Sequence, residues 1–211
     1  MLIVHHLGLS QSDKVVWLCE ELGLDYELRL YDRDPVTRLA PAEYKALHPA
    51  GTAPVIQDGD VTLAESGAVI EYILAKYGKG RLVAAPDAPN FADYLYWFHF
   101  APGTMQAAML VEIVLSIVGA TDGAASALKA RSENGFRMLE ERLGQVPYLA
   151  GEEFTAADIM NLFTLTTGRL FVPRDFTDFP NIRAYVRRVM DRPACQRALA
   201  KADPGLTIPV D

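Results

Sequence analysis

The pattern of the chain changes abruptly after its first 80 residues, and this change limits the possible folds. Short apolar runs alternate with turn residues up to that point, after which strand-like segments almost vanish. The intervening stretch contains Pro86 and Pro89 among small side chains, a composition typical of a linker. We therefore predict two domains, residues 1–80 and 91–211, joined by a linker at residues 81–90.

The first domain begins with a strand, a helix and a second strand. Residues 2–6 are apolar and β-branched, residues 14–22 carry apolar side chains at helical spacing, and residues 26–31 alternate. Gly23 fits the C-cap of the helix. Two strands joined through a helix are expected to lie parallel, with a right-handed crossover.

A hairpin and a further helix complete this domain. Short apolar runs on both sides of Asp58 and Gly59 predict a β-hairpin. Ser66 then fits the N-cap of a helix over residues 68–77. The predicted order of the first domain is βαβ followed by ββα.

The second domain is predicted to be all-helical. Helical patterns cover residues 91–118, 123–143, 155–168 and 180–200. Pro102 and Gly103 are expected to kink or split the first of these. Its most apolar part, residues 107–118, is too short to span a bilayer and contains a glutamate, so we interpret it as a buried helix. The fold class is thus an α/β domain followed by a helical bundle.

The charge of the chain bears on its partners. The formal net charge is -7, which makes sequence-independent nucleic-acid binding a poor hypothesis. Four arginines lie at helical spacing, and we interpret them as one solvated helix face. They are Arg183, Arg187, Arg188 and Arg192.

The two cysteines, Cys19 and Cys195, predict neither a disulfide framework nor a metal site. They form no CxxC motif and no ligand cluster with the histidines of the chain. The histidines are His5, His6, His48 and His99. Unpaired cysteines fit a reducing compartment, and the N-terminal residues lack a signal-peptide pattern. We therefore expect a cytoplasmic protein without a metal, a nucleic-acid partner or a membrane.

Pro54 stands directly before an apolar strand of the predicted hairpin. Taken alone, it favours an ordinary trans proline that opens an edge strand. The alternative is a cis bond between Ala53 and Pro54, which would turn the chain sharply. That turn would present the Ala53 backbone to an extended peptide added at the sheet edge.

Glu65 and Ser66 lie at the junction between a strand and a helix. A helix N-terminus offers unpaired N–H groups and a positive dipole end, which suit a carboxylate. Glu65 would then complement an ammonium group, so the pair would suit an α-amino acid head. The alternative is a plain N-cap with an acidic neighbour.

Ser10 lies in the turn after the first strand, just before a helix. A hydroxyl group there could donate to a bound thiolate and so lower the pKa of the thiol. Ser12 could do the same, although we favour an N-cap role for it.

The order and spacing of these segments resemble the cytosolic glutathione transferase family, over residues 2–199. The first domain carries the resemblance at residues 9–14, 20–27, 49–55 and 63–73. In the second, Thr155 and Asp158 supply the two halves of a capping box. Residues 180–194 resemble the next helix of the family and its proline stop. The resemblance is greatest to theta-like members and to bacterial and fungal ones.

The resemblance implies a thioredoxin-like first domain and a glutathione site. Ala53, before a cis Pro54, would hold the cysteinyl backbone of glutathione, and Glu65 with Ser66 would bind its γ-glutamyl head. Ser10 would activate the thiol, because the theta-like members carry the same Ser-Gln pair. The remaining expected glutathione-binding residues are Gln11, His48 and Thr52. Thr52 stands where many relatives carry lysine, and His48 where asparagine is common.

The implied activity is attack of a glutathione thiolate on a small hydrophobic electrophile, with glutathione as co-substrate and a role in detoxification. The electrophile pocket would lie between the domains. Its apolar candidates are Leu7, Leu9, Phe100, Met105 and Met109. The alternatives are a glutathione-dependent reduction of disulfides or peroxides and a non-enzymatic, regulatory glutathione-binding protein. The resemblance also implies a homodimer.

Overall fold

The computed structural model describes residues 1–208 of the chain. Their contacts form two compact units. The first combines Met1–Leu82 with Met190–Thr207, and the second begins at Val83 and contains the residues up to Val189. Our prediction of two domains joined by a linker at residues 81–90 stays a prediction.

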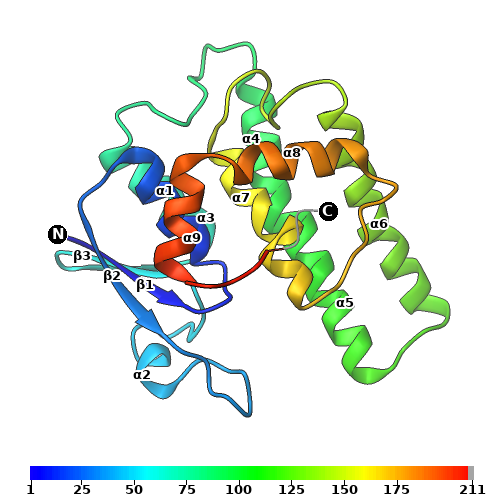
Figure 1. Ribbon diagram of the computed structural model, residues 1–211, viewed down its shortest axis with the longest axis horizontal. Helices are drawn as coiled ribbons and strands as arrows, with labels where there is room; N and C mark the ends of the chain where they lie inside the picture. The colour runs from blue at the N-terminus through cyan, green and yellow to red at the C-terminus, as the bar shows by residue number, and fades with distance from the viewer. Residues whose placement is uncertain (209–211) are drawn as a thin grey trace. The chain divides into compact units, whose positions relative to one another are not determined.

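The first unit has a four-stranded mixed sheet in the order β2-β1-β3-β4 (Figure 1). β1 (Leu2–Leu7) and β2 (Tyr26–Tyr31) are parallel, and α1 (Asp13–Leu22) connects them. β3 (Val55–Asp58) runs antiparallel to both β1 and β4 (Val61–Ala64). α3 (Ser66–Tyr77) follows β4 and packs beside α1, while the short α2 (Ala42–Lys45) follows β2. The predicted βαβ-ββα order and fold class are confirmed.

The two faces of the sheet have separate cores because side chains alternate along each strand. On one face, Leu7 and Val55 pack with Tyr44 of α2, whose hydroxyl donates to the His5 carbonyl at 3.3 Å. The other face lies under α1 and α3, and its core is fully buried. It includes Val4, Val16, Leu18, Val69, Ile70 and Ile73.

The last helix described, α9 (Pro193–Ala202), belongs to the first unit and packs along α1 (Figure 1). Glu20 of α1 accepts hydrogen bonds from Arg197 at 3.0 Å and Lys201 at 2.5 Å of α9. Arg192, at the N-cap of α9, binds the buried Glu21 carboxylate. Our interpretation of the arginine cluster as a solvated face was therefore wrong for Arg192, because its guanidinium is paired with a carboxylate. Helical spacing could not reveal this pair, since the two residues lie far apart in the sequence.

The second unit is helical throughout its regular parts. α4 (Phe91–Phe100) continues through a π-helical segment (Ala101–Gln106) into α5 (Ala107–Val118). The predicted disturbance at Pro102 takes this form because proline lacks an N–H group and its ring crowds the carbonyl four residues earlier. A wider turn absorbs both effects without ending the helix.

The described part of this unit contains three more helices. They are α6 (Gly123–Leu143), α7 (Ala156–Leu165), which a 3-10 turn (Thr167–Leu170) follows, and α8 (Pro180–Met190). The capping box at the start of α7 is confirmed, with the Thr155 N–H donating to Asp158 Oδ2 at 2.8 Å. The helical stretch predicted over 180–200 is divided between α8 and α9, because Pro193 starts a new helix at its first position.

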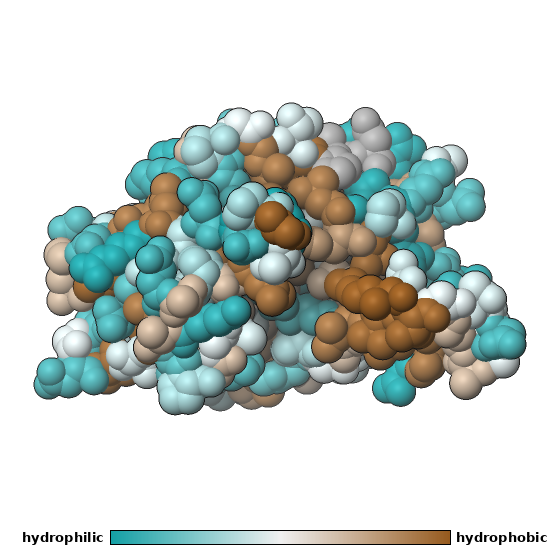
Figure 2. Space-filling view, turned by 90° about the horizontal axis from the view of Figure 1, so that it is seen from below, coloured by the Kyte–Doolittle hydropathy of each residue, from teal (hydrophilic) through white to brown (hydrophobic). Residues whose placement is uncertain are grey.

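Our interpretation of residues 107–118 as a buried helix was wrong. α5 has no buried residue, and its apolar side chains at positions i, i+4, i+7 and i+8 are exposed. They are Leu110, Val114, Ile117 and Val118. Figure 2 shows a continuous hydrophobic patch on the surface of the molecule. By length and composition the whole run Phe91–Val118 could cross a membrane, as could core helices of many water-soluble proteins.

Candidate functional site

Strand register brings three predicted segments to the same end of the sheet. His5 of β1 pairs with Val55 of β3, which pairs in turn with Ala64 of β4. The turn after β1, the residues before β3 and those after β4 therefore meet at this end of the sheet. These segments are residues 8–12, 53–54 and 65–66.

The bond between Ala53 and Pro54 is cis, as the resemblance implied and contrary to what Pro54 suggested by itself. Pro54 is buried and Ala53 is half-buried. The paired part of the β1–β3 ladder begins at Val55, so the backbone groups of Ala53 lie beyond its last pair. An extended peptide could therefore pair with them at this end of the sheet.

Glu65, not Ser66, occupies the N-cap of α3, so our N-cap prediction was one residue off. Glu65 has a φ of 71°, unusual for a residue other than glycine, and its carbonyl accepts the Val69 N–H at 2.9 Å. Ser66 is buried as the first helical residue, while Glu65 is exposed. The N–H groups of the first helical turn point out of the helix end, which favours a carboxylate there.

The turn after β1 is held by hydrogen bonds with β2 and with the segment that follows β2. The Gly8 N–H donates to the Tyr31 carbonyl at 3.0 Å. The Arg33 guanidinium donates to the carbonyls of Gly8 and Leu9 at 2.8 and 3.1 Å. Leu9 has a φ of 53°, so these contacts stabilise a backbone conformation that leucine seldom adopts.

Ser10 and Ser12 are both buried in this turn, with their hydroxyl oxygens 2.7 Å apart. Ser12 stands at the N-cap position of α1, but its side chain makes no capping hydrogen bond. Our capping interpretation of the Ser12 hydroxyl was therefore wrong. The hydroxyl contacts His6 Nδ1 at 2.9 Å and accepts the Leu7 N–H at 3.2 Å.

Two further residues, His6 and Asp203, join this network, and our sequence analysis missed both of them. His6 Nε2 lies 3.2 Å from Asp203 Oδ2, and Oδ1 of the same carboxylate accepts the Leu9 N–H at 3.1 Å. Asp203 lies at the C-cap of α9, almost 200 residues after His6. A histidine inside an apolar strand was the one signal available for this site.

Gln11 and Lys14 form a separate contact near the turn. Lys14 Nζ donates to Gln11 Oε1 at 3.2 Å. Burial lowers the pKa of Lys14 to about 7, although Asp13 opposes the shift. No feature of the sequence distinguished this lysine from an exposed one at the start of a helix.

The other predicted binding residues vary in exposure. His48 is half-buried, and its Nδ1 accepts the Ala50 N–H at 3.2 Å, while Thr52 is exposed. Both cysteines are buried, and burial raises the pKa of the Cys19 and Cys195 thiols to about 12. Neither thiol is therefore suited to act as a nucleophile near neutral pH.

The apolar candidates divide between the two units. Leu7 packs in the core of the first unit, and Leu9 lines a surface hollow beside His6 and Asp203. Phe100 is buried in the second unit, where Met105 and Met109 line an internal cavity of about 10 Å³. That volume holds about one water molecule, so the cavity is too small for an organic electrophile.

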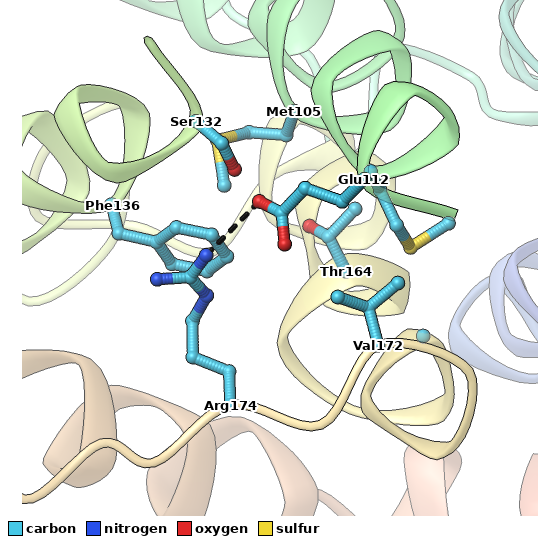
Figure 3. Close-up of a pocket in the computed structure, with 9 residues that line it drawn as sticks. Met105, Glu112, Ser132, Phe136, Thr164, Val172 and Arg174 are labelled. Atoms are coloured by element: carbon cyan, nitrogen blue, oxygen red, sulfur yellow. Dashed lines mark hydrogen bonds and ion pairs between the residues drawn. The ribbon is translucent and has the colours of Figure 1, made fainter. Parts of the chain in front are cut away.

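The wall of this cavity is more polar than the sequence suggested. Figure 3 shows Arg174 between Phe136 and Glu112, with the guanidinium 4.0 Å from the ring centre. Arg174 also pairs with Glu112 at 3.1 Å and Glu133 at 2.5 Å. These contacts join α5, α6 and the segment before α8 within the second unit.

Two family models match the chain. "Glutathione S-transferase, N-terminal domain" matches residues 10–76, and "Glutathione S-transferase, C-terminal domain" matches residues 100–193. Glutathione S-transferase 3 of Schizosaccharomyces pombe is 31% identical, over 96% of this chain and 88% of the relative. GstB of Escherichia coli is 29% identical, over 88% of this chain and 91% of its own.

Solved structures agree with these matches. A glutathione S-transferase of Actinobacillus pleuropneumoniae has a TM-score of 0.89 and 37% identity, over 98% of this chain and 94% of its own. A glutathione transferase of Phanerochaete chrysosporium, solved with oxidized glutathione, has a TM-score of 0.74 and 26% identity, over 95% of this chain and 94% of its own.

Proposed function

Since the chain belongs to the glutathione S-transferase family, we propose that Ser10 activates bound glutathione as a thiolate, which then attacks a small hydrophobic electrophile. The observation that carries this proposal is that three segments meet at one end of the sheet. Ser10 lies in one of them, and the other two carry the groups suited to a peptide backbone and an amino-acid head.

We assign the parts of glutathione to these segments. Ala53 pairs with the cysteinyl backbone, because its own backbone lies beyond the last pair of the strand ladder. Ser66 and the N–H groups at the start of α3 bind the γ-glutamyl carboxylate, while Glu65 pairs with the adjacent ammonium group. Gln11, His48 and Thr52 complete the site around the rest of the tripeptide.

Ser10 is the catalytic residue in this proposal. A hydroxyl that donates to a sulfur anion stabilises the thiolate and lowers the pKa of the thiol. No general base is needed at the moment of attack, because the nucleophile is already ionised. Proximity of the electrophile then supplies much of the remaining rate enhancement.

Leu9 is the apolar candidate that contacts the electrophile in this proposal, because it lines a surface hollow of the first unit. Leu7 and Phe100 are buried, and Met105 and Met109 line a cavity that is too small for an organic molecule. The buried cysteines weigh against a reductase that uses a protein thiol, since both thiols stay protonated at neutral pH.

We further propose a cytoplasmic homodimer, and we place its interface on α5. The exposed apolar stripe of α5, at positions 110, 114, 117 and 118, supports this assignment, because such stripes mark protein interfaces. A second copy of the chain would cover side chains that otherwise face water.

The conjugation of glutathione to a chloronitrobenzene substrate, followed against pH, tests the function. Ser10→Ala is expected to lower kcat/KM about 100-fold at neutral pH, the order of loss seen when one donor to a developing anion is removed. Ser126→Ala is the matched control, because this exposed serine of α6 belongs to the second unit and donates to the Thr121 carbonyl. An unchanged rate and thiol pKa in Ser10→Ala would remove Ser10 from the mechanism.

Glutathione binding is tested separately by calorimetry with S-methylglutathione, which has no ionisable thiol. Ser66→Ala and Glu65→Gln are expected to weaken binding about tenfold each, the effect of one lost charge-assisted hydrogen bond. Ser10→Ala should leave this affinity unchanged. Absence of binding by the unmodified protein would contradict the proposed function.

A further inference from the structure

We propose that the proton of the bound glutathione thiol passes through Ser10 and Ser12 to His6, which Asp203 holds in the accepting tautomer. The inference rests on the proposed function and names where the thiol proton goes. Each link is a contact within the first unit, from the turn after β1 to the end of α9.

The network is oriented from its Asp203 end. A carboxylate only accepts hydrogen bonds, so the His6 Nε2 that lies 3.2 Å away carries the proton. Burial opposes ionisation of Asp203, but the His6 ring and the Leu9 N–H outweigh it and hold the pKa of the carboxyl below its ordinary value. In neutral His6, Nδ1 then has a lone pair, which can accept a proton.

The tautomer of His6 sets the direction of the Ser12 hydroxyl. Neutral His6 carries no proton on Nδ1, so the Ser12 hydroxyl, 2.9 Å away, donates to it. The Ser12 oxygen accepts the Leu7 N–H at 3.2 Å. The second lone pair of the oxygen accepts the Ser10 hydroxyl at 2.7 Å.

Ser10 keeps one acceptor position for a ligand. Its hydroxyl donates to Ser12, and its oxygen accepts the Ser12 N–H at 3.3 Å, which uses one of two lone pairs. In this arrangement Ser10 cannot donate to a thiolate, because its proton points inward. A thiol S–H can instead donate to the remaining lone pair.

Proton transfer along the chain converts the thiol to a thiolate and leaves every oxygen neutral. The sulfur proton moves to Ser10 Oγ, the Ser10 proton to Ser12 Oγ, and the Ser12 proton to His6 Nδ1. The products are a thiolate and an imidazolium that is paired with the Asp203 carboxylate. Ser10 now donates to the sulfur, as the proposed function requires, and each hydrogen bond has reversed.

The surroundings of His6 fit a proton acceptor that is shielded from water. His6 is only 1% exposed, although the hollow beside it is lined by Tyr31 and Asp32 as well as Asp203. Arg33 is the cation near this carboxylate and binds the turn carbonyls. Ion pairs between α1 and α9 hold the helix whose C-cap is Asp203.

Proton release on glutathione binding tests the relay. In weakly buffered solution, thiolate formation is followed by its ultraviolet absorption and proton release by a pH indicator. The relay predicts that the unmodified protein forms thiolate at neutral pH with clearly less than one proton released per thiolate. A hydroxyl that only stabilises the thiolate would release one proton for each thiolate formed.

Two variants separate the proton acceptor from the hydrogen bond. Ser12→Ala removes the link, while His6→Asn keeps a hydrogen-bonding amide near Nδ1 but cannot accept the proton. Both are expected to raise the apparent pKa of the bound thiol by about one unit and to lower kcat/KM about tenfold at neutral pH. The loss should be recovered at higher pH, and each thiolate should then release one proton.

Three controls keep the result unambiguous. Affinity for S-methylglutathione should be unchanged in both variants, which shows that the binding site is intact. Asp203→Asn, which preserves the shape of the side chain, should raise the thiol pKa in the same direction if either other variant fails to fold. Ser126→Ala should behave as the unmodified protein does.

The relay would be overturned by one proton released per thiolate in the unmodified protein, or by an unchanged thiol pKa in folded Ser12→Ala, His6→Asn and Asp203→Asn. An unmodified protein that binds no glutathione would instead remove the proposed function, and the relay with it. The two failures are therefore distinguishable.

Discussion

Arg192 binds Glu21 through two hydrogen bonds, from Nε to Oε1 at 2.6 Å and from Nη2 to Oε2 at 2.8 Å. The contact ties the N-cap of α9 to the end of α1 across 171 positions of sequence. The Glu21 side chain is only 8% exposed, and its carboxylate also accepts a hydrogen bond from the indole N–H of Trp17 at 3.1 Å.

Arg192→Ala is expected to lower the free energy of unfolding by about 2 kcal/mol, because it leaves a largely buried carboxylate with one partner fewer. Urea unfolding measures the loss. Arg188→Ala, which removes an exposed guanidinium bound to the Pro147 carbonyl, should cost much less. Adding Glu21→Gln to Arg192→Ala should recover part of the stability, and a double variant no better than Arg192→Ala would contradict this account.

The hydrogen bonds of Asp58 lead us to expect that acid lowers the stability of the first unit. The carboxylate accepts hydrogen bonds from Lys76 at 2.6 Å, Tyr77 at 2.6 Å and Tyr72 at 3.0 Å. Burial opposes its ionisation, but these bonds outweigh burial and lower its pKa to about 2. The folded pKa lies below the unfolded value of about 4, so this stabilisation is present above pH 4 and lost as the pH falls towards 2.

Urea unfolding between pH 2 and pH 7 checks this sign. Asp58→Asn should lose about 2 kcal/mol near pH 7, and its difference from the unmodified protein should shrink below pH 4. Asp60→Asn, in the same hairpin turn but exposed, is the control. A difference between Asp58→Asn and the unmodified protein that is constant with pH would show that the carboxylate acts without its charge.

The cysteines are expected to take no part in the chemistry. The double variant Cys19→Ala and Cys195→Ala should keep both conjugation and any glutathione-dependent reduction, within about a factor of two, because thiols with a pKa near 12 are protonated at neutral pH. Alkylation by iodoacetamide should be slow in the native protein and fast after unfolding. Loss of a reductase activity alone in the double variant would assign that activity to a protein thiol.

The exposed apolar stripe of α5 allows a test of the proposed dimer. Leu110 and Ile117 are 61% and 79% exposed, so glutamate at either position should not disturb the fold. If the stripe is the subunit interface, the double variant should shift the mass measured by light scattering from twice 23.2 kDa to 23.2 kDa. Val36→Glu, at a position 89% exposed in the first unit, should leave the mass unchanged.

The local parts of the fold were predictable because they depend on short-range patterns. The strand at 26–31, the helix at 123–143 and the Thr155 capping box follow from alternation, helical spacing and capping chemistry. The exposure of α5 could not be predicted in this way, because an apolar stripe has the same sequence pattern whether a core or a partner covers it.

The site was predictable only where its residues lie close together in sequence. Ser10, Ala53 and Ser66 lie in turns or junctions whose chemistry is local. His6 and Asp203 are brought together by the packing of α9 on α1, and this packing depends on pairs such as Glu20 with Arg197. No periodicity or motif connects residues that far apart, so the acidic end of the relay could not be predicted.

The His6–Asp203 hydrogen bond also has a consequence for biosynthesis. The ribosome completes the sheet and both buried serines long before it adds Asp203. The nascent chain therefore passes through a stage in which every glutathione-binding residue proposed here has been made but His6 lacks its carboxylate partner. A message truncated within α9 would yield a protein arrested at that stage, and its activity would report how much the final turn of α9 contributes to the completed enzyme.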